Sequence, residues 1–527
     1  MPLNKEREWV GSKNMSTHGS SHISLVQFEQ DKKNEQFVEP TESAMEFVHG
    51  SMSVFSRLHS LRGKVRLFGH FFHAQFLLLA CVEFFSFVCA YLFVLPLLYS
   101  SAEMVVPTAY KLPEAAFSGL VLMLAIASMG LYDTRQREGI KGALGRLMVA
   151  FLSGLGVLTA ANTLYPVFSI SNIFLVQFVL IAFIYSILLR LYFYKFVDGN
   201  VLQRRVLVIG AGKRAASIDK LRRKTDQRGF DLVGFVRTSA EEPVQVRKQK
   251  IVDTDDDIRT FALQNQIDEI VIAPDDRRRK LPLDGLIDCR MSGVAITDLL
   301  DFFERETEKI RLDLIQPSWL IYADGFKRDV LRSFSKRAFD IIVSSIMLIL
   351  CAPFMALTAL GIFIESKGRG PILYSQARVG RNGKCFKLYK FRSMRTDAEQ
   401  DGIARWAKEN DSRVTHVGSF IRKYRFDELP QLWNIFVNDM SLVGPRPERP
   451  EFVEQLCKIN ALYKERHRVT PGLAGWAQVC YPYGASKRDS MEKLQYDLYY
   501  VKNHGILFDF YILVQTAEIV FFRKGVR

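Results

Sequence analysis

The chain has 527 residues, of which 48% are hydrophobic, and it carries 71 Lys and Arg against 56 Asp and Glu. This length is too great for a single core, so two or more domains are expected. A basic, apolar chain with no basic run interleaved with aromatic residues is expected to be a membrane protein and not a nucleic-acid-binding protein. Its seven cysteines include no Cys-x-x-Cys pair and its nine histidines lack metal-protease spacing, which argues against a disulfide framework or a zinc site.

The first 200 residues are expected to form a tail and a membrane bundle. Residues 1–56 are polar and lack periodicity, which is typical of a disordered tail. Residues 57–200 contain four apolar runs, at about 71–99, 114–132, 143–165 and 172–196. Each is near the ~20 residues that cross a bilayer. Lys and Arg gather before the first run, between the second and third, and after the fourth. The positive-inside rule therefore predicts four transmembrane helices with both ends of the bundle in the cytoplasm.

Glu83 lies inside the first apolar run, where a charged side chain is costly. Two interpretations are open. Glu83 is either a functional intramembrane acid, or a carboxyl group that is paired with a polar neighbour or placed near a cavity. The second interpretation is preferred.

Residues 201–330 are expected to form a soluble α/β domain with a parallel sheet. Arg205–Ile209 is typical of a buried strand, and Gly210-Ala-Gly212 then opens a helix, as in Rossmann-like dinucleotide folds. Ala215 replaces the third glycine of that motif, and Asp231 precedes a strand, so no ribose-binding acid is evident. We prefer a domain that keeps the Rossmann-like shape without a cofactor. A nucleotide loop at the two glycines is the alternative.

Residues 331–527 begin with a fifth apolar segment, at 336–366, which has Pro353 near its middle. Inside a helix, proline removes a hydrogen bond and clashes with the preceding turn, so a sharp bend is expected. Cationic residues flank both ends, which places both in the cytoplasm and predicts a re-entrant membrane helix. Ser344, Ser345 or side chains of the following domain are expected to satisfy the carbonyl groups freed at the bend. The alternative is a plain kinked span.

The remainder, about 367–527, is expected to be a mixed α/β domain, and its most informative stretch is 422–434. Asp427 and Glu428 lie side by side among arginines, with Pro430 stiffening the backbone. Arginine side chains hold phosphoryl oxygens, and a suitably placed Asp can attack phosphorus. The alternative is an ordinary helix start, where acids and an early proline are favoured.

Six stretches, in order, resemble the bacterial sugar transferases, in the long form of the polyprenyl-phosphate hexose-1-phosphate transferases. In that form, four membrane helices and a Rossmann-like domain precede a catalytic unit, and the resemblance covers about 67–527. The matching stretches are Lys336–Asp340, Lys390–Met394, Asn410–Thr415, Asp427–Gln431, Met440–Pro447 and Pro471–Gln478. Two departures concern the bend and the site. Ala352 stands where the family often has Ser, so Cys351 or another donor must serve at the bend. Phe426 stands where Leu is common.

The resemblance implies transfer through a covalent Asp427 phosphosugar. Asp427 attacks the β-phosphate of a UDP-sugar and expels UMP, and undecaprenyl phosphate then accepts the sugar phosphate. Mg²⁺, with Asp427 and Glu428 as candidate ligands, and nearby cations neutralise the phosphate charge. The candidate phosphate-binding residues are Lys390, Arg392, Arg422 and Arg446. Each of these cations is equally well explained as a surface residue or a loop brace. Gln431 and Asn434 either touch the sugar or uridine or, as preferred, cap a loop.

The expected protein is a multi-pass enzyme of the bacterial inner membrane, with its catalytic domain on the cytoplasmic face. It would start an exopolysaccharide or O-antigen-type glycan, and a homodimer would suit its extra domains. One rival is a membrane sensor or scaffold with an inactive transferase domain, against which the intact Asp427–Glu428 pair argues. Another is a nucleotide-sugar dehydratase or epimerase, which needs a Tyr-x-x-x-Lys pair and a full glycine loop that the α/β region lacks. No residue identifies the sugar.

Overall fold

The computed structural model describes residues 63–67, 70–99, 111–132, 140–164, 171–196, 203–221, 224–227, 229–239, 241–252, 257–276, 281–315, 330–396, 413–481, 484 and 486–521. The tail that the sequence predicts at 1–56 lies outside these residues. Parts of the loops between the apolar helices, and of the matching stretch 410–415, also lie outside them.

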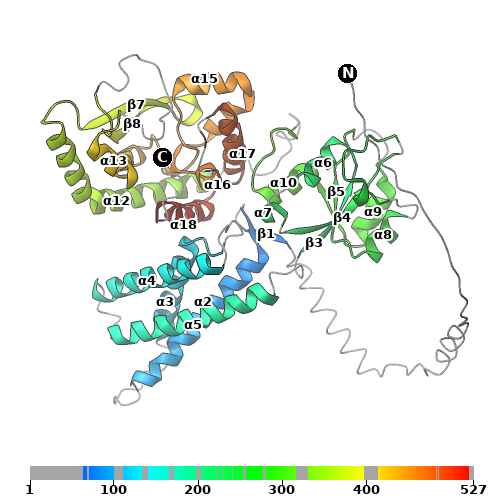
Figure 1. The fold of residues 1–527 in the computed structure, drawn as a ribbon, viewed down its shortest axis with the longest axis horizontal. Coiled ribbons are helices and arrows are strands. Elements are labelled where there is room, and N and C mark those ends of the chain that lie inside the picture. The colour runs from blue at the N-terminus through cyan, green and yellow to red at the C-terminus, as the bar shows by residue number, and fades with distance from the viewer. Residues whose placement is uncertain are drawn as a thin grey trace, which may run out of the picture. The chain divides into compact units, whose positions relative to one another are not determined.

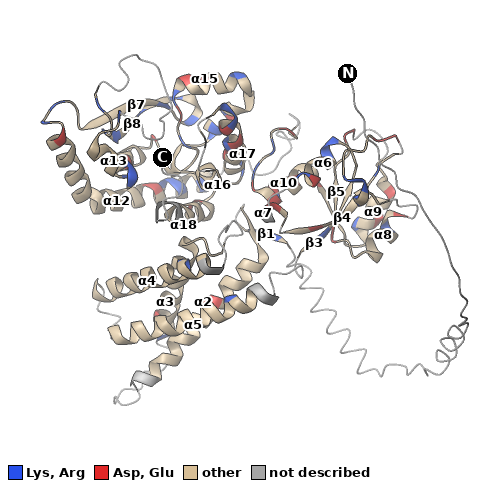
Figure 2. Cartoon of the chain, in the orientation of Figure 1, with Lys and Arg blue, Asp and Glu red and all other residues tan. Residues whose placement is uncertain are grey.

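The described chain begins with an antiparallel hairpin and continues into four apolar helices (Figure 1). The elements are β1 (Lys64–Leu67), β2 (His70–His73), α2 (Ala74–Tyr99), α3 (Leu112–Ser128), α4 (Ile140–Leu164) and α5 (Asn172–Phe196). Side chains from all four helices share one core, for example Phe87, Leu122, Phe151 and Phe174. Figure 2 shows these helices almost wholly free of charged residues, because a charge inside a bilayer is costly.

The apolar helices differ in length. Within the described residues, α2, α4, α5 and α12 (Val330–Glu365) are long and apolar enough to cross a membrane. Helix α3 has 17 residues, which is the lower end of what crosses the hydrocarbon layer. All four runs expected between 57 and 200 therefore form helices. The fourth long candidate span is the segment that was expected to be re-entrant.

Glu83 is fully buried in the bundle and has charged and polar partners. Arg190 donates to both carboxylate oxygens, from Nε at 2.7 Å and from Nη2 at 2.9 Å. The hydroxyl groups of Tyr132 and Ser186 donate to Glu83 at 2.5 and 2.7 Å. A buried charge is tolerated when it is paired and hydrogen-bonded in this way. The preferred interpretation of Glu83, as a paired carboxyl group, is confirmed.

The middle domain is a parallel four-stranded sheet flanked by helices. The strands are β3 (Arg204–Ile209), β4 (Phe230–Val236), β5 (Glu269–Ile272) and β6 (Ala295–Asp298), in the order β4-β3-β5-β6. The helices are α6 (Lys213–Asp219), α7 (Lys224–Gln227), α8 (Ile258–Gln264), α9 (Leu283–Met291) and α10 (Leu299–Thr307), with a 3₁₀ turn η5 (Lys248–Lys250). The parallel α/β sheet that the sequence predicts is therefore confirmed.

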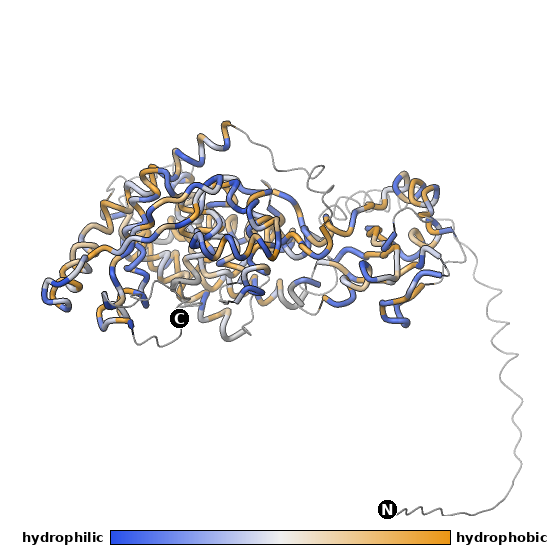
Figure 3. Tube along the Cα trace, turned by 90° about the horizontal axis from the view of Figure 1, so that it is seen from above, coloured by the Kyte–Doolittle hydropathy of each residue, from blue (hydrophilic) through white to orange (hydrophobic). Residues whose placement is uncertain are grey.

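Both faces of this sheet are covered, as the continuous apolar run in β3 predicts. Val206 and Val208 point into one core with Phe302, whereas Leu207 and Ile209 point into a second core on the other face. Figure 3 shows hydrophobic and hydrophilic stretches alternating along this domain, at the right of the view. Amphipathic elements of this kind bury one side and expose the other.

Helix α12 contains 36 residues, with Pro353 inside it, and it changes direction in Figure 1. A straight helix of this length would extend about 54 Å. Near its start, Arg337 Nη1 donates to the carbonyl of Ile435 at 2.8 Å. Near its end, Glu365 Oε1 accepts from the amide of Val417 at 3.2 Å. Both ends of α12 thus contact the same C-terminal domain, as the bend expected at Pro353 requires.

The two serines that were expected to help at the bend have another partner. Ser344 and Ser345 both donate to the carbonyl of Ile341, at 3.2 and 2.7 Å. The carbonyl that Pro353 leaves without its helical donor is that of Ile349, two turns later. The expected serine contribution is therefore wrong, because a hydroxyl group on a helix reaches back only to its own preceding turn.

The C-terminal domain is mixed α/β, as predicted. Its elements are β7 (Leu373–Val379), η6 (Arg381–Gly383), β8 (Cys385–Phe391), α13 (His416–Lys423), η7 (Phe426–Glu428), α14 (Gln431–Phe436), β9 (Ser441–Val443), α15 (Pro450–Ile459), η8 (Ala461–Arg468), β10 (Gly472–Ala474), α16 (Trp476–Cys480), α17 (Lys487–Asn503) and α18 (Ile506–Phe521). Strands β7 and β8 pair antiparallel, and β9 pairs parallel with β10. A Cβ atom on Gly472 would collide with the backbone of Gly444, so glycine permits the close approach of β10 to the end of β9.

Candidate active site

Asp427 is presented by the 3₁₀ turn η7, which follows Arg425. The backbone of Arg425 is left-handed, with φ of 62°, a conformation that residues other than glycine rarely adopt. Strain of this kind is concentrated at functional sites. Asp427 is 7% exposed, and within the described residues its Oδ1 is buried without a hydrogen-bond partner. A buried, unpartnered carboxylate oxygen is costly, so this atom fits a role toward a ligand.

Glu428 is surrounded by cations, unlike its neighbour. Its Oε1 accepts from Lys390 Nζ at 2.9 Å and from Arg446 Nη2 at 2.7 Å, and Arg425 Nη1 lies 3.8 Å away. Lys390 comes from β8 and Arg446 from the loop after β9, so one carboxylate oxygen joins two separate segments to η7. Adjacent side chains on a 3₁₀ turn point about 120° apart, and the two acids accordingly have different partners.

The two carboxyl groups also differ in their pKa values. Burial, and then the charge of Glu428, raise the pKa of Asp427, against the opposing effect of Lys390, Arg425 and Arg422. Burial also acts to raise the pKa of Glu428, but Lys390, Arg446 and Arg425 outweigh it and hold that pKa well below its usual range. Glu428 is therefore the fixed negative charge of the site. For Asp427, burial disfavours the ionised form and the nearby cations favour it.

The four candidate phosphate-binding cations are not equivalent in the structure. Lys390 and Arg446 contact Glu428 directly. Arg422, on α13, acts on the charge of Asp427. Arg392 is directed elsewhere, because its Nη1 donates to the carbonyl of Arg369 at 3.1 Å.

Asn434 holds the strand that carries Lys390. This fully buried side chain accepts from the amide of Tyr389 at 3.0 Å and donates to the carbonyl of Lys387 at 2.8 Å and to Asp439 at 3.2 Å. These bonds make it a brace between α14 and β8, which agrees with the preferred structural role. Gln431 is also buried, and its Nε2 has no hydrogen-bond partner among the described residues.

A second ion pair, which sequence reasoning did not single out, supports the loop of Arg446. Arg466 and Asp497 are both buried, with Arg466 Nε and Nη2 lying 2.9 and 2.8 Å from Asp497 Oδ2. Arg466 also donates to the hydroxyl group of Tyr463 and to the carbonyl of Arg446, each at 2.9 Å. The pair therefore fixes the backbone from which the Arg446 side chain reaches Glu428. The sequence pointed to this region only through the matching stretch that begins at Pro471, between Arg466 and Asp497.

The matching stretch at the start of α12 attaches that helix to the domain. Lys336 Nζ donates to Asp509 at 2.5 Å and to the carbonyl of Val443 at 3.0 Å. Asp340 Oδ1 accepts from the hydroxyl group of Ser441 at 3.1 Å and the amide of Leu442 at 3.0 Å. Strand β9 leads directly to the Arg446 loop. These residues thus place α12 against the strand that carries part of the site.

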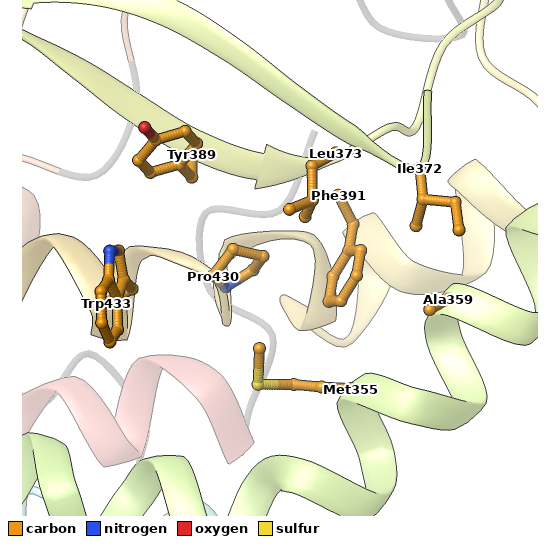
Figure 4. Close-up of a pocket in the computed structure, with 8 residues that line it drawn as sticks. All are labelled: Met355, Ala359, Ile372, Leu373, Tyr389, Phe391, Pro430 and Trp433. Carbon is orange, nitrogen blue, oxygen red and sulfur yellow. The ribbon is translucent and has the colours of Figure 1, made fainter. Parts of the chain in front are cut away.

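An apolar cavity lies close to the acids in the chain (Figure 4). Its volume is about 510 Å³. Met355 and Ala359 line it from α12, just after the bend, and Trp433 lines it from α14. The other lining residues are Ile372, Leu373, Tyr389, Phe391 and Pro430. Tyr389 and Phe391 flank Lys390, and Pro430 is three residues after Asp427. The lining and the charged site therefore come from the same segments of the chain, although successive side chains on a strand such as β8 point to opposite faces.

Several amide groups of the loop at Gly210 and Gly212 in the middle domain have partners within the chain. The first two amides of α6 donate to the two carboxylate oxygens of Asp275, both at 2.8 Å. The amide of Ala211 donates to Glu242 at 2.9 Å. Amides at this position would hold a pyrophosphate in a dinucleotide-binding fold. In this structure, acids of the chain itself take these amides.

The described residues contain no group of three His, Cys, Asp or Glu side chains that could hold a metal ion by themselves. This does not conflict with Mg²⁺, which usually takes one or two carboxylates and completes its shell with water and substrate phosphates. The unpartnered Oδ1 of Asp427 fits such a ligand. Glu428 is a less suitable one, since Oε1 already accepts from two cations.

Comparison with known proteins points to one family. A family model described as bacterial sugar transferase matches residues 331–523. The chain is 38% identical over 239 residues to the UDP-N-acetylgalactosamine-undecaprenyl-phosphate N-acetylgalactosaminephosphotransferase of Aeromonas hydrophila, covering 45% of this chain and 55% of that protein. It is 32% identical over 346 residues to the undecaprenyl-phosphate glucose phosphotransferase of Komagataeibacter xylinus, covering 62% and 60%.

A third relative is covered more completely. The chain is 34% identical over 334 residues to the UDP-glucose:undecaprenyl-phosphate glucose-1-phosphate transferase of Klebsiella pneumoniae. The matched region covers 61% of this chain and 69% of that protein. Of the first two relatives the chain spans just over half the length, 55% and 60%. The matched family region contains Asp427, Glu428 and all of their cationic partners described above.

Proposed function

The chain belongs to the bacterial sugar transferase family, and from this we propose that it transfers a hexose-1-phosphate from a UDP-sugar to undecaprenyl phosphate. The observation that carries the proposal is the pair at η7. Asp427 has a buried, unpartnered carboxylate oxygen, and its neighbour Glu428 is held by Lys390 and Arg446. The related proteins are named for transfer to undecaprenyl phosphate.

The proposed reaction has two displacements at phosphorus. In the first, a carboxylate oxygen of Asp427 bonds to the β-phosphorus of the donor, the bond from that phosphorus to the bridging oxygen breaks, and UMP leaves. In the second, an oxygen of the lipid phosphate bonds to the same phosphorus, and the bond to Asp427 breaks. The products are a polyprenyl-diphosphate sugar and free enzyme. A covalent intermediate lets two bulky substrates use one site in turn.

The surroundings of Asp427 support its role as the nucleophile. The attack requires the ionised carboxyl group, whereas burial and Glu428 raise the pKa of Asp427. Lys390, Arg425 and Arg422 oppose that effect and favour the ionised form of the carboxyl group. The same cations favour the anionic oxygens of a bound diphosphate, which would otherwise repel the nucleophile. We propose Lys390 and Arg446 as the principal phosphate-binding side chains.

We also propose Mg²⁺ as a cofactor, held by a carboxylate oxygen of Asp427 or Glu428 and by the donor phosphates. When bound, the ion would neutralise phosphate charge at the reacting centre. Excess chelator is expected to stop UMP release, and added Mg²⁺ should restore it. Undiminished release in chelator would remove the metal from the proposal.

The acceptor and the membrane arrangement follow from α12. We propose that the apolar cavity beside Pro430 receives the first isoprene units of the lipid, with the lipid phosphate directed to Asp427. We further propose that α12 is re-entrant and that the catalytic domain lies on the cytoplasmic face of the inner membrane. Contacts of both ends of α12 with one domain support this topology. A topology reporter fused after Ser366 should give a cytoplasmic signal, and a periplasmic signal would favour a plain span.

We also propose roles for the remaining parts of the chain. The parallel sheet order β4-β3-β5-β6 supports a Rossmann-like domain, and the Asp275 contacts support one that binds no dinucleotide. The reaction would start an exopolysaccharide or O-antigen-type glycan, because transfer to a lipid phosphate begins such a chain. A homodimer is consistent with these domains and stays a prediction.

The test of the reaction is UMP release from a panel of UDP-sugars, with and without polyprenyl phosphate. Asp427→Asn should abolish release, because an amide cannot form the acyl phosphate. Glu454→Gln, on the exposed face of α15, is the control and should retain full activity. Donor labelled in the sugar should leave label on wild-type protein but not on D427N. Release near the wild-type rate by D427N, or label on another residue, would remove Asp427 as the nucleophile.

A further inference from the structure

A second group of cations lies next to the Arg446 loop. Arg378, near the end of β7, donates from Nη1 to the carbonyl of Pro447 at 3.2 Å and from Nη2 to Gln376 at 2.8 Å. The next residue, Val379, donates its amide to the carbonyl of Glu448 at 3.0 Å. Strand β7 is thereby tied to the two residues that directly follow Arg446.

Lys493 approaches the same place from α17. Its Nζ donates to the carbonyl of Gly484 at 2.9 Å. Burial lowers the pKa of Lys493, and Arg446 lowers it further, against the opposing charge of Glu448. Arg446, Glu448 and Lys493 are thus close enough to affect one another's charge, although they come from different elements.

Glu448 is the acid that acts on both Arg378 and Lys493, and Asp489 and Asp497 also raise the pKa of Lys493. Burial lowers the pKa of Arg378, Glu448 opposes the change, and Arg446 and Arg449 add to it. Glu448 Oε2 lies 3.7 Å from Arg378 Nη1, a loose ion pair whose partners are 20% and 30% exposed. Arg446 is paired with Glu428 at 2.7 Å. Several cations therefore share Glu448, and another anion would stabilise their charged forms.

The position of the group matches the chemistry of the donor. In a sugar nucleotide the two phosphates share one bridging oxygen, so a site for the second phosphate must adjoin the site for the first. Arg446 reaches Glu428, beside the nucleophile, and it is linked through Pro447 and Glu448 to Arg378. Arg378 and Lys493 are only partly exposed, so a phosphate held there is partly withdrawn from water.

We propose that Arg378 and Lys493, adjoining Arg446, form a second anion subsite that binds the nucleotide-side phosphate of the donor and then the leaving nucleoside monophosphate. This inference rests on the proposed function. It goes further by assigning the two phosphates of the donor to different residues. The reacting phosphate belongs to Lys390 and Arg446, and the departing phosphate belongs to Arg378 and Lys493.

The test uses full-length protein in lipid nanodiscs and the variants Arg378→Gln and Lys493→Gln. Each should raise the KM for UDP-sugar and the inhibition constant of UMP about 10-fold, which corresponds to about 1.4 kcal/mol, with kcat changed less than twofold. Arg378→Lys should recover part of the affinity because it restores the charge. Lys458→Gln is the control, since Lys458 is exposed on α15 and pairs with the equally exposed Glu454. A fall in kcat at unchanged KM would overturn the assignment.

Direct binding of UMP separates this inference from the proposed reaction. Calorimetry with D427N, which cannot turn over, should show UMP binding that Arg378→Gln weakens about 10-fold. The same result with a wild-type protein that never releases UMP would retain the subsite and reject the reaction. Unchanged UMP affinity in both variants would reject the subsite. Inorganic phosphate should bind far more weakly than UMP, and equal affinities would make the group a general anion site and refute the assignment to a nucleotide.

Discussion

Replacing Arg466 by Met tests how far the buried ion pair supports the site. Arg466 and Asp497 have side chains that are 5% and 3% exposed, so the substitution leaves Asp497 buried without its cation. It also removes the bonds to Tyr463 and to the carbonyl of Arg446. Breaking a buried pair by removing one partner costs about 3–5 kcal/mol. For a domain of this size, that loss lowers Tm by roughly 6–20 °C.

The matched control lies two residues away on the same 3₁₀ segment. Arg468 pairs with Glu465 at 2.7 Å, but its side chain is 61% exposed. Exposed pairs contribute about 0.2–1 kcal/mol at most, so Arg468→Met should lower Tm by no more than a few degrees. The two variants remove the same charge and insert the same side chain. The variants differ in the burial of the pair and in the two further bonds that Arg466 makes, to Tyr463 and to the carbonyl of Arg446.

Thermal unfolding in detergent, followed by intrinsic tryptophan fluorescence, gives the comparison, and UMP release at a temperature where both proteins are folded gives the second readout. Arg466→Met should unfold at the lower temperature and should also lose activity, because the backbone of Arg446 is no longer held. Equal Tm values for the two variants would refute the argument that burial decides the contribution. Full activity of the folded Arg466→Met protein would refute its role in positioning Arg446.

Three further outcomes are expected. Glu428→Gln removes a negative charge that raises the pKa of Asp427, so the acid limit of labelling by donor should move to lower pH, and a move to higher pH would contradict the electrostatics. Asn434→Ala breaks the brace on β8 and should lower the rate of labelling more than donor binding, measured by single-turnover kinetics. Arg190→Met leaves Glu83 buried without its cation and should reduce the yield of folded protein, judged by size-exclusion chromatography against wild type.

The sequence predicted most of the elements because their signals are local. The apolar runs gave the helices of the bundle, and the apolar strand Arg204–Ile209 gave the parallel sheet. Asp427 and Glu428 could be identified together because they are adjacent to each other and to arginines. Lys390 could be identified only through a matching stretch, since it is 38 residues from Glu428.

The remaining features depend on contacts between distant residues that look ordinary in the chain. Arg466 and Asp497 are 31 residues apart, and no local pattern indicates that they are buried together. Asp275 is 62 residues from the loop whose amides it occupies, so the glycine pattern alone could not show that the chain caps itself. The serines near the bend were misassigned for a related reason. They lie close to Pro353 in the sequence, but a hydroxyl group on a helix bonds to a carbonyl of the turn before it.

The different surroundings of two adjacent acids support the proposal that one site holds both a carboxylate nucleophile and an anionic donor. Glu428 keeps Lys390 and Arg446 together before any substrate binds, because their charges would otherwise repel each other. Each cation has several N–H donors, so it can bind a phosphoryl oxygen and keep its bond to Glu428. Oδ1 of Asp427 makes no such bond among the described residues, so no partner has to leave this atom before the proposed attack. In the proposed reaction, the fixed charge of Glu428 therefore leaves the neighbouring carboxylate free for attack at phosphorus.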